Sequence, residues 1–365
     1  MTPPRRAPKR PRTAKRSRPR RVRKTSARPA PRSAEAARAS RRALVCGSLA
    51  FDTIMVFGDR FGAHILPDKI HMLNVAFLVP EMRREFGGCA GNICYNLKLL
   101  GDACYPMATV GRDFAPYADW LASNGISDRH VRVIANQHTA QAFITTDLDD
   151  NQMTAFHPGA MQHSHLNRID DARDIALGIV APDGRTGMLE HAAQFHAAGI
   201  PFLFDPGQGL PMFDAEELET FVEQATWVAV NDYEWQLMQT RTGWSVADVV
   251  ARVDALIVTH GAQGSVVHTE QGATPIPCAK ANRVVDPTGC GDAYRAGVIH
   301  GLLQGLDWPQ TGRIAALLAA IKIESRGTQN HRFSSASFAR RYRQAFGTDL
   351  PRGSGSKPAL RARTR

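Results

Sequence analysis

The sequence lacks an uninterrupted apolar stretch of the roughly 18 or more residues that a membrane helix requires. Hydrophobic residues make up 43% of the chain and charged residues 22%, which is the balance of an ordinary globular protein. We therefore expect no membrane-spanning segment. One large α/β domain with appended tails accounts for the 365 residues, because such folds often exceed the usual domain size.

Cysteines are few and scattered along the chain. The six cysteines include no CxxC pair, and no histidines cluster at zinc-ligand spacing. A chain of this size needs no disulfide to hold a core, so we expect reduced thiols, a cytoplasmic location and no structural metal.

Acidic residues are almost missing from the two ends of the chain. Residues 1–42 hold 17 Lys and Arg against one acid, Glu35, and residues 351–365 hold five basic residues and no acid. Residues 43–350 hold 23 basic and 33 acidic residues, so the formal charge of +11 conceals a body of net charge −10. Such a body repels the phosphate backbone, which leaves nucleic-acid binding to the tails alone.

The segment 1–42 also lacks aromatic residues and an apolar period. It is rich in Pro, Arg, Ala and Ser and cannot bury enough surface to offset the entropy of ordering. We expect a disordered basic extension there and a second disordered basic tail at 351–365. An Arg-rich transit peptide, or an extension with no part in catalysis, are the alternatives.

Short apolar runs that end in small or polar residues recur through the body of the chain. The first covers 43–50, and later runs cover 200–204, 227–230 and 256–259. Helix-like segments lie between them, so the pattern predicts an α/β fold with a mostly parallel central sheet and helices on both faces. Ligands bind beyond the carboxyl ends of such strands, where we expect four polar or small residues to converge. These are Asp52, Asp205, Asn231 and Gly261.

Residues 53–86 and 104–156 are more irregular. Within the second range, 141–147 and 152–157 form two alternating runs around an Asp-Leu-Asp-Asp-Asn turn, which is typical of a β-hairpin. We expect parts of both ranges to form a small β-sheet lid over the edge of the central sheet, within a single domain of residues 43–350.

The strongest motif is Asp-Pro-Thr-Gly-Cys-Gly-Asp-Ala at 286–293. Gly289 and Gly291 permit a tight turn whose amides, with that of Cys290, point together at the start of a helix and favour an anion. Asp292 at the same place is positioned to take a proton from a hydroxyl that attacks a phosphoryl group. The alternative is that Asp292 only caps the helix and the glycines only form a turn.

This motif resembles the second signature, D-T-x-G-A-G-D, of the PfkB or ribokinase family, with Pro287 at its second position and Cys290 in place of Ala. The resemblance extends over residues 43–346 and implies a ribokinase-like fold. It assigns Asp292 as the catalytic base and Gly289 to Gly291 as the anion hole. It also assigns Asp286 and Thr288 to a site for a monovalent cation, K⁺.

Two matches to the same family lie near the start of the domain. Asp52 ends Gly-Ser-Leu-Ala-Phe-Asp at 47–52, where the family uses the acid to hold sugar hydroxyls; a simple turn aspartate is the alternative. Phe-Gly-Gly-Cys-Ala-Gly-Asn at 86–92 resembles the first signature. By this resemblance Gly87 and Gly88 let the backbone approach the substrate and hinge the lid, and Asn92 contacts the ribose.

A further match is Asn231-Asp232-Tyr233-Glu234, which reproduces the N-x-x-E motif associated with Mg²⁺ and phosphate. Mg²⁺ keeps most of its waters, so we expect Glu234 to act on the ion through water. The alternative for Asn231 is a helix cap without further role.

The resemblance also predicts which residues bind the nucleotide, three glycines and a threonine. Thr259, Gly261 and Gly264 match the T-x-G-x-x-G turn that lies beside the nucleotide phosphates and ribose. Gly327 falls where the family closes the nucleotide pocket.

The predicted lid is the part of the sequence that indicates which molecule accepts the phosphoryl group. Residues 147–161, including Gln-Met-Thr-Ala-Phe-His-Pro-Gly-Ala-Met, resemble the lid of prokaryotic nucleoside and adenosine kinases of this family. We interpret Phe156 or Met161 as packing near the base while Gln152 offers it hydrogen bonds. A hairpin core around Phe156 is the alternative.

A sugar-phosphate kinase would need basic side chains near the acceptor, and Arg83 and Arg84 are the nearest candidates. The sequence thus predicts an ATP-dependent nucleoside kinase, similar to adenosine kinase, that uses Mg²⁺ and acts as a monomer or homodimer. The resemblance implies a site for K⁺ but leaves open whether K⁺ activates the enzyme. A sugar kinase of the ribokinase or fructokinase type is the alternative. A further alternative is a regulatory binding protein that has no catalytic activity and whose tails contact nucleic acid.

Overall fold

The computed structural model describes Pro4 and residues 41–65, 75–149 and 151–353. The predicted disordered extension and tail lie almost wholly outside these residues. No helix within the described ranges is both long and apolar enough to cross a membrane.

A nine-stranded sheet forms the centre of the molecule, and seven of its strands are parallel. Two antiparallel strands, β12 and β13, complete one edge. In spatial order the strands are β13 (Gly272–Ile276), β12 (Ser265–Thr269), β11 (Ala255–Thr259), β10 (Trp227–Asn231), β9 (Phe202–Phe204), β8 (Ile175–Val180), β1 (Arg42–Cys46), β4 (Ala103–Gly111) and β5 (His130–Ile134). The predicted α/β fold with a mostly parallel sheet is confirmed.

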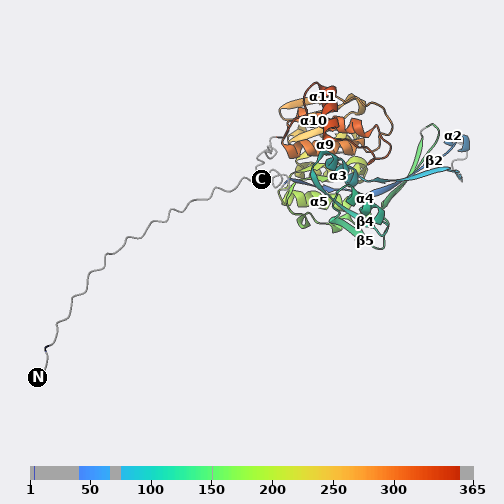
Figure 1. The fold of residues 1–365 in the computed structure, drawn as a ribbon, viewed down its shortest axis with the longest axis horizontal. Helices are drawn as coiled ribbons and strands as arrows, with labels where there is room; N and C mark the ends of the chain where they lie inside the picture. The colour runs from blue at the N-terminus through green and yellow to red at the C-terminus, as the bar shows by residue number, and fades with distance from the viewer. Residues whose placement is uncertain (1–3, 5–40, 66–74, 150, 354–365) are drawn as a thin grey trace.

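Helices cover both faces of this sheet (Figure 1). Alternate residues of β1 enter two separate cores, Ala43 and Val45 on one face and Leu44 and Cys46 on the other, as the two-residue period of a strand requires. One face carries α3 (Cys89–Leu100), α4 (Ala115–Ser123), α9 (Cys290–Gln304), α10 (Trp308–Lys322) and α11 (Ser335–Phe346). The other carries α5 (Arg185–Ala197), α6 (Ala215–Gln224), α7 (Asp232–Thr242) and α8 (Val246–Val250).

A second, four-stranded sheet projects from this body, and β2 labels it in Figure 1. Its spatial order is β3 (Glu81–Gly87), β2 (Ala50–Val56), β6 (Ala140–Thr146) and β7 (Gln152–His157), and the short α2 (Phe61–His64) follows β2. The predicted hairpin of 141–157 is β6 and β7. Of the range 104–156, however, β4, α4 and β5 belong to the large sheet and its helices, because β4 pairs in parallel with β1.

Candidate active site

Asp292 lies in the first turn of α9, at the third helical position. The residue before the helix is Gly289, whose left-handed φ of 78° turns the chain into α9 without a side-chain cap. Asp292 instead accepts a hydrogen bond of 2.8 Å at its Oδ2 from Nδ2 of Asn92, in the first turn of α3. The alternative that Asp292 is only the helix cap is therefore wrong.

Asp52 reaches the same place from β2 of the small sheet. A Cβ placed on Gly87, at the end of the neighbouring β3, would lie 2.3 Å from Oδ2 of Asp52, so the carboxylate occupies the space that the glycine leaves. Burial, and then the charge of Asp292, raise the pKa of Asp52 to about 7. The three polar residues expected at the acceptor, Asp52, Asn92 and Asp292, thus converge.

The environment of Asp292 suits a general base. Burial raises the pKa of Asp292 to about 6, and the hydrogen bond from Asn92 opposes this increase. A base with a pKa close to neutrality holds a proton more strongly than an exposed aspartate and is still mostly ionised at pH 7. Asp292 can therefore accept a proton from an attacking hydroxyl.

The turn before α9 presents backbone amides beside Asp292. Helical hydrogen bonding begins with the amide of Ala293, which donates to the carbonyl of Gly289 at 3.0 Å, so the amides before it have no partner within the helix. The Cys290 amide, predicted to join the anion hole, donates to the carbonyl of Pro287 at 3.1 Å. A Cβ on Gly291 would meet open space, so its backbone is approachable. Gly289 and Gly291 are the better anion-hole candidates.

Asn231 and Glu234 form a capping box at the start of α7. Oε2 of Glu234 accepts from the Asn231 amide at 2.8 Å and Oε1 accepts from the Asn231 side chain at 2.9 Å. The same glutamate lies 3.8 Å from Arg295, which is buried and donates to Asp205 at 3.1 Å. Asn231 is thus a helix cap, as its alternative interpretation held, and it also orients Glu234 at the end of β10.

The residues predicted to line the nucleotide follow the neighbouring strand. Thr259, the last residue of β11, pairs in register with Asn231, so the two motifs lie side by side at the carboxyl edge of the sheet. Gly264 has a φ of 93°, and a Cβ there would lie 2.3 Å from the carbonyl oxygen of Ile276, so only glycine fits. Gly261 also has a positive φ of 54°. This edge holds Asp205 and Asn231, as expected.

Asp286 ties the turn before α9 to the segment that follows α10. Its Oδ1 accepts from the Thr288 amide at 2.9 Å and its Oδ2 accepts from the Gly327 amide at 2.8 Å. Burial alone would raise the pKa of Asp286, but these hydrogen bonds outweigh it and lower the pKa. Nζ of Lys322 donates to the Asp286 carbonyl at 2.7 Å, so a positive charge already lies where K⁺ was expected.

Phe156 and Gln152 lie on the same face of the small sheet as Asp52. Phe156 pairs with Ala142, which pairs with Asp52, so the phenyl ring is level with the carboxylate two strands away. Phe156 is 52% exposed, so the alternative of a hairpin core around it is wrong. Gln152 lies four residues further along β7, about 13 Å away at the rise of an extended strand. Phe156 is therefore the better candidate for contact with a base.

The match to a known family is extensive. The model of the pfkB family of carbohydrate kinases matches residues 52–334. The chain belongs to the pfkB family. The match covers Asp52, Asn92, Glu234 and Asp292, and the resemblance inferred from the sequence is confirmed.

Similar proteins include curated nucleoside kinases and solved structures. A nucleoside kinase from Methanocaldococcus jannaschii is 33% identical over 267 residues, which is 72% of this chain and 87% of the relative. The structure of Burkholderia thailandensis nucleoside kinase in complex with inosine is 49% identical with a TM-score of 0.77, over 84% of this chain and 99% of that one. The crystal structure of the M. jannaschii enzyme is 30% identical with the same TM-score of 0.77, over 83% and 98%. The pfkB kinase described here is a phosphotransferase with a ribokinase-like fold.

The sequence analysis missed three residues that contact predicted site residues. Arg295 follows Asp292 by one helical turn, Lys322 is the only charged residue in the apolar run 314–323, and Gln329 donates to Oδ1 of Asn92 at 3.0 Å. A charge inside an apolar helical run is a signal that could have identified the first two. Gln329 carries no such signal.

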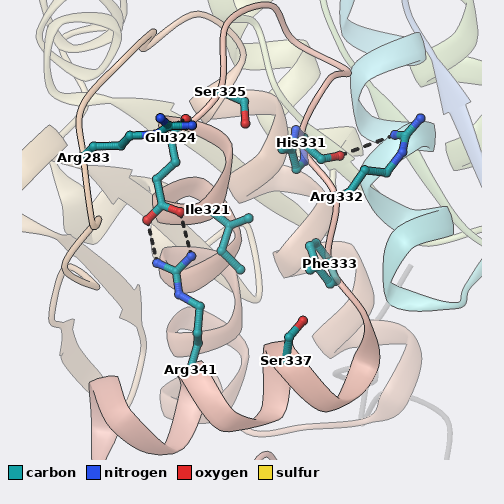
Figure 2. A pocket seen from close by; sticks show the side chains of 9 residues that line it. All are labelled: Arg283, Ile321, Glu324, Ser325, His331, Arg332, Phe333, Ser337 and Arg341. Atoms are coloured by element: carbon teal, nitrogen blue, oxygen red, sulfur yellow. Dashed lines mark hydrogen bonds and ion pairs between the residues drawn. The ribbon is translucent and has the colours of Figure 1, made fainter.

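A cavity of about 270 Å³ is lined by nine residues, among them Glu324, His331 and Arg341 (Figure 2). The carboxylate of Glu324 forms a paired contact with Arg341 in its wall, at 2.7 and 2.8 Å. None of the predicted site residues lines this cavity. The candidate active site is therefore defined by the side chains that converge around Asp292 and not by this cavity.

Proposed function

We propose that this chain is an ATP-dependent nucleoside kinase, similar to adenosine kinase, that transfers the γ-phosphoryl group to the ribose 5′-hydroxyl. The observation that carries the proposal is the convergence of Asp52 and Asp292, with Phe156 on the same sheet face as Asp52. Asp52 can accept both hydrogens of a vicinal diol, while the phenyl ring offers a flat apolar surface to a base. The nucleoside kinases among the relatives support this acceptor class.

The reaction is a direct displacement. The 5′-oxygen attacks the γ-phosphorus, the bond from that phosphorus to the β-γ bridging oxygen breaks, and ADP leaves with the electron pair. The hydroxyl proton passes to Asp292, whose ionised carboxylate is held by Asn92. The amides of Gly289 and Gly291 at the start of α9 stabilise the charge that spreads over the phosphoryl oxygens.

Mg²⁺ would be held through water rather than directly. Both carboxylate oxygens of Glu234 already accept hydrogen bonds from Asn231, yet a carboxylate has about four lone-pair positions, so one remains on each oxygen. These positions fit ordered waters of a hydrated Mg²⁺, which would neutralise the phosphate charge. Within the described part of the chain, no three His, Cys, Asp or Glu side chains gather into a group that could hold a metal ion.

The small sheet would act as the lid of a kinase domain spanning residues 43–350. Gly88 marks its base, with a φ of 86° and with no room for a Cβ, which would lie 2.6 Å from the Ser48 carbonyl oxygen. Closure of the sheet would exclude water, which otherwise competes with the acceptor for the phosphoryl group. We place this activity in the cytoplasm.

The test is a panel of acceptors assayed with ATP and Mg²⁺, comprising adenosine, inosine, guanosine, cytidine, ribose and fructose. We expect turnover of at least one nucleoside with a kcat/KM above that of ribose. Turnover restricted to free sugars would refute the nucleoside assignment and favour a sugar kinase. Asp292→Asn serves as the inactive reference, since a neutral amide cannot accept the hydroxyl proton.

A further inference from the structure

Lys322 is the last residue of α10, and its side chain is completely buried. It is the only charge in the run Ile-Ala-Ala-Leu-Leu-Ala-Ala-Ile-Lys-Ile at 314–323. Burial of an ammonium group is unfavourable unless polar partners compensate for the lost water. The partners of Lys322 therefore indicate what the charge is there to do.

Backbone carbonyls hold this ammonium group. Nζ of Lys322 donates to the Asp286 carbonyl at 2.7 Å and to the Ser325 carbonyl at 3.4 Å. Rings of backbone carbonyl oxygens are also what proteins use to replace the hydration shell of K⁺. The ammonium group thus occupies surroundings of the kind that suit an alkali cation, and it carries the same single charge.

The ammonium group also lies within electrostatic range of the proposed catalytic base, Asp292. It interacts electrostatically with the carboxylates of Asp286 and Asp292 and with the thiol of Cys290. Asp286 in turn fixes the two segments that meet here, through the Thr288 and Gly327 amides. One positive charge at this point offsets two carboxylates and steadies the turn that leads into α9.

A second cation at Asp286 is disfavoured by these contacts. The carbonyl oxygen of Asp286 is engaged by Lys322, and each carboxylate oxygen accepts from a backbone amide, which leaves one lone-pair position on each carboxylate oxygen, close to the ammonium charge. A K⁺ ion placed beside them would also be repelled by the ammonium charge in a poorly screened interior. The residues predicted to bind K⁺, Asp286 and Thr288, therefore do not fit that ion.

We propose that the ammonium group of Lys322 is the resident monovalent cation of this enzyme, so that phosphoryl transfer needs no K⁺ or other alkali ion. The inference rests on the proposed kinase function. Lys322 is a positioning residue in this scheme: it holds the Asp286 turn, and hence the amides before α9, in place. It does not touch the reacting atoms.

The first experiment uses the unaltered full-length protein. Phosphoryl transfer to the best nucleoside is measured in the chlorides of K⁺, Na⁺, NH₄⁺ and tetramethylammonium at one fixed ionic strength. We expect the four kcat values to agree within about twofold, because a fixed ionic strength equalises general screening. Activation by K⁺ of about tenfold or more over tetramethylammonium would overturn the proposal.

A second experiment removes the ammonium charge of Lys322. Lys322→Met keeps the apolar stem and removes the charge, so we expect kcat in tetramethylammonium to fall by about 10- to 100-fold, the loss typical of one charge-assisted interaction. Added K⁺ or NH₄⁺ should restore part of this loss in the variant. The matched control is Lys98→Met, in the last turn of α3, which should show neither the loss nor the rescue.

Binding of Tl⁺, a K⁺ surrogate followed by ²⁰⁵Tl NMR, gives a readout that is independent of turnover. We expect no specific Tl⁺ binding to the unaltered protein and a new site in Lys322→Met. Saturable Tl⁺ binding to the unaltered protein, abolished by Asp286→Asn, would overturn the proposal. If Lys322→Met does not fold, the salt series and the Tl⁺ titration of the unaltered protein decide whether the enzyme needs an alkali cation. Absence of turnover in every salt would instead refute the kinase function, and the Tl⁺ titration would still test the cation site.

Discussion

Nδ2 of Asn92 donates a hydrogen bond of 2.8 Å to Oδ2 of Asp292, although 200 residues separate the two in the sequence. The opposite atom of the same amide, Oδ1, accepts from Nε2 of Gln329 at 3.0 Å. Oε1 of Gln329 accepts from the indole of Trp120 at 2.8 Å. Because an indole can only donate, Trp120 fixes the orientation of Gln329, and Gln329 fixes that of Asn92. Asn92 must therefore present a donor to the carboxylate of Asp292.

Gln329→Glu should reverse this polarity. A carboxylate at this position accepts from both Trp120 and Asn92, which turns the Asn92 carbonyl toward Asp292 and replaces attraction by repulsion. We expect kcat/KM to fall by about 10- to 100-fold, the value of a hydrogen bond to a charged group, and the acid limb of its pH profile to move to higher pH. The control is Gln271→Glu in the exposed turn between β12 and β13. An unchanged acid limb would mean that Gln329 only supports packing.

The pH profile of the unaltered enzyme should report the two carboxylates at the acceptor. The pKa values of Asp292 and Asp52 are raised to about 6 and about 7, from an ordinary 3.8. The base acts only when it is ionised, so kcat/KM should decline as pH falls through 7 and 6. Asp52→Asn removes a like charge and should move this limb to lower pH. An acid limb of the kcat/KM profile near pH 4 in the unaltered protein would contradict the raised pKa values of Asp52 and Asp292.

Arg295→Met should destabilise the fold. The guanidinium group is buried between Asp205, at 3.1 Å, and Glu234, at 3.8 Å, so its loss leaves two buried carboxylates without a countercharge. We expect the free energy of unfolding to drop by about 3–5 kcal/mol in urea titrations at neutral pH. The drop should shrink as pH falls, because protonation removes the uncompensated charge. Arg343→Met, which breaks an exposed pair with Asp349, should cost only about 0–1 kcal/mol. Equal losses would contradict the role of the buried cluster.

Gly87→Ala should weaken acceptor binding through Asp52 while leaving Asp292 unaltered. The added methyl would lie 2.3 Å from Oδ2 of Asp52 and must displace that carboxylate. We expect the acceptor KM to rise by about 10- to 100-fold, the loss of hydrogen bonds to a charged group, while the KM for ATP changes little. Gly62→Ala, where a Cβ has nothing within 4 Å, is the control. If the KM for ATP rises in step with that of the acceptor, Asp52 does not act selectively on the sugar.

Phe156→Ala and Phe143→Ala form a matched pair on the small sheet. Both rings are exposed, at 52% and 41%, and they lie on neighbouring strands but on opposite faces. Only Phe156 shares the face of Asp52, so only its loss should raise nucleoside KM, by about 3- to 10-fold for one aromatic contact. The KM for free ribose should be unchanged in both variants. Equal effects of the two substitutions on nucleoside KM would remove Phe156 from the base site.

Features that depend on near neighbours could be predicted from the sequence. The apolar runs ending at Asn231 and Thr259 are strands, and the glycine-rich turn at 289–291 does begin a helix. The hairpin of β6 and β7 was predicted from alternation and turn residues alone. Family motifs also marked Asp52, Asn92 and Asp292 as candidates, although the motifs give no distance between them.

Only the tertiary structure decided which side chains meet and what each atom donates or accepts. Lys322 reaches the Asp286 carbonyl across 36 residues, and Asn92 reaches Asp292 across 200. Turns and caps are set by hydrogen bonds within about four residues, and the local sequence dictates these. Contacts such as Lys322 with Asp286 depend on how whole helices pack against the sheet. Side-chain packing therefore decided the charge at the predicted K⁺ site, which the motif itself could not reveal.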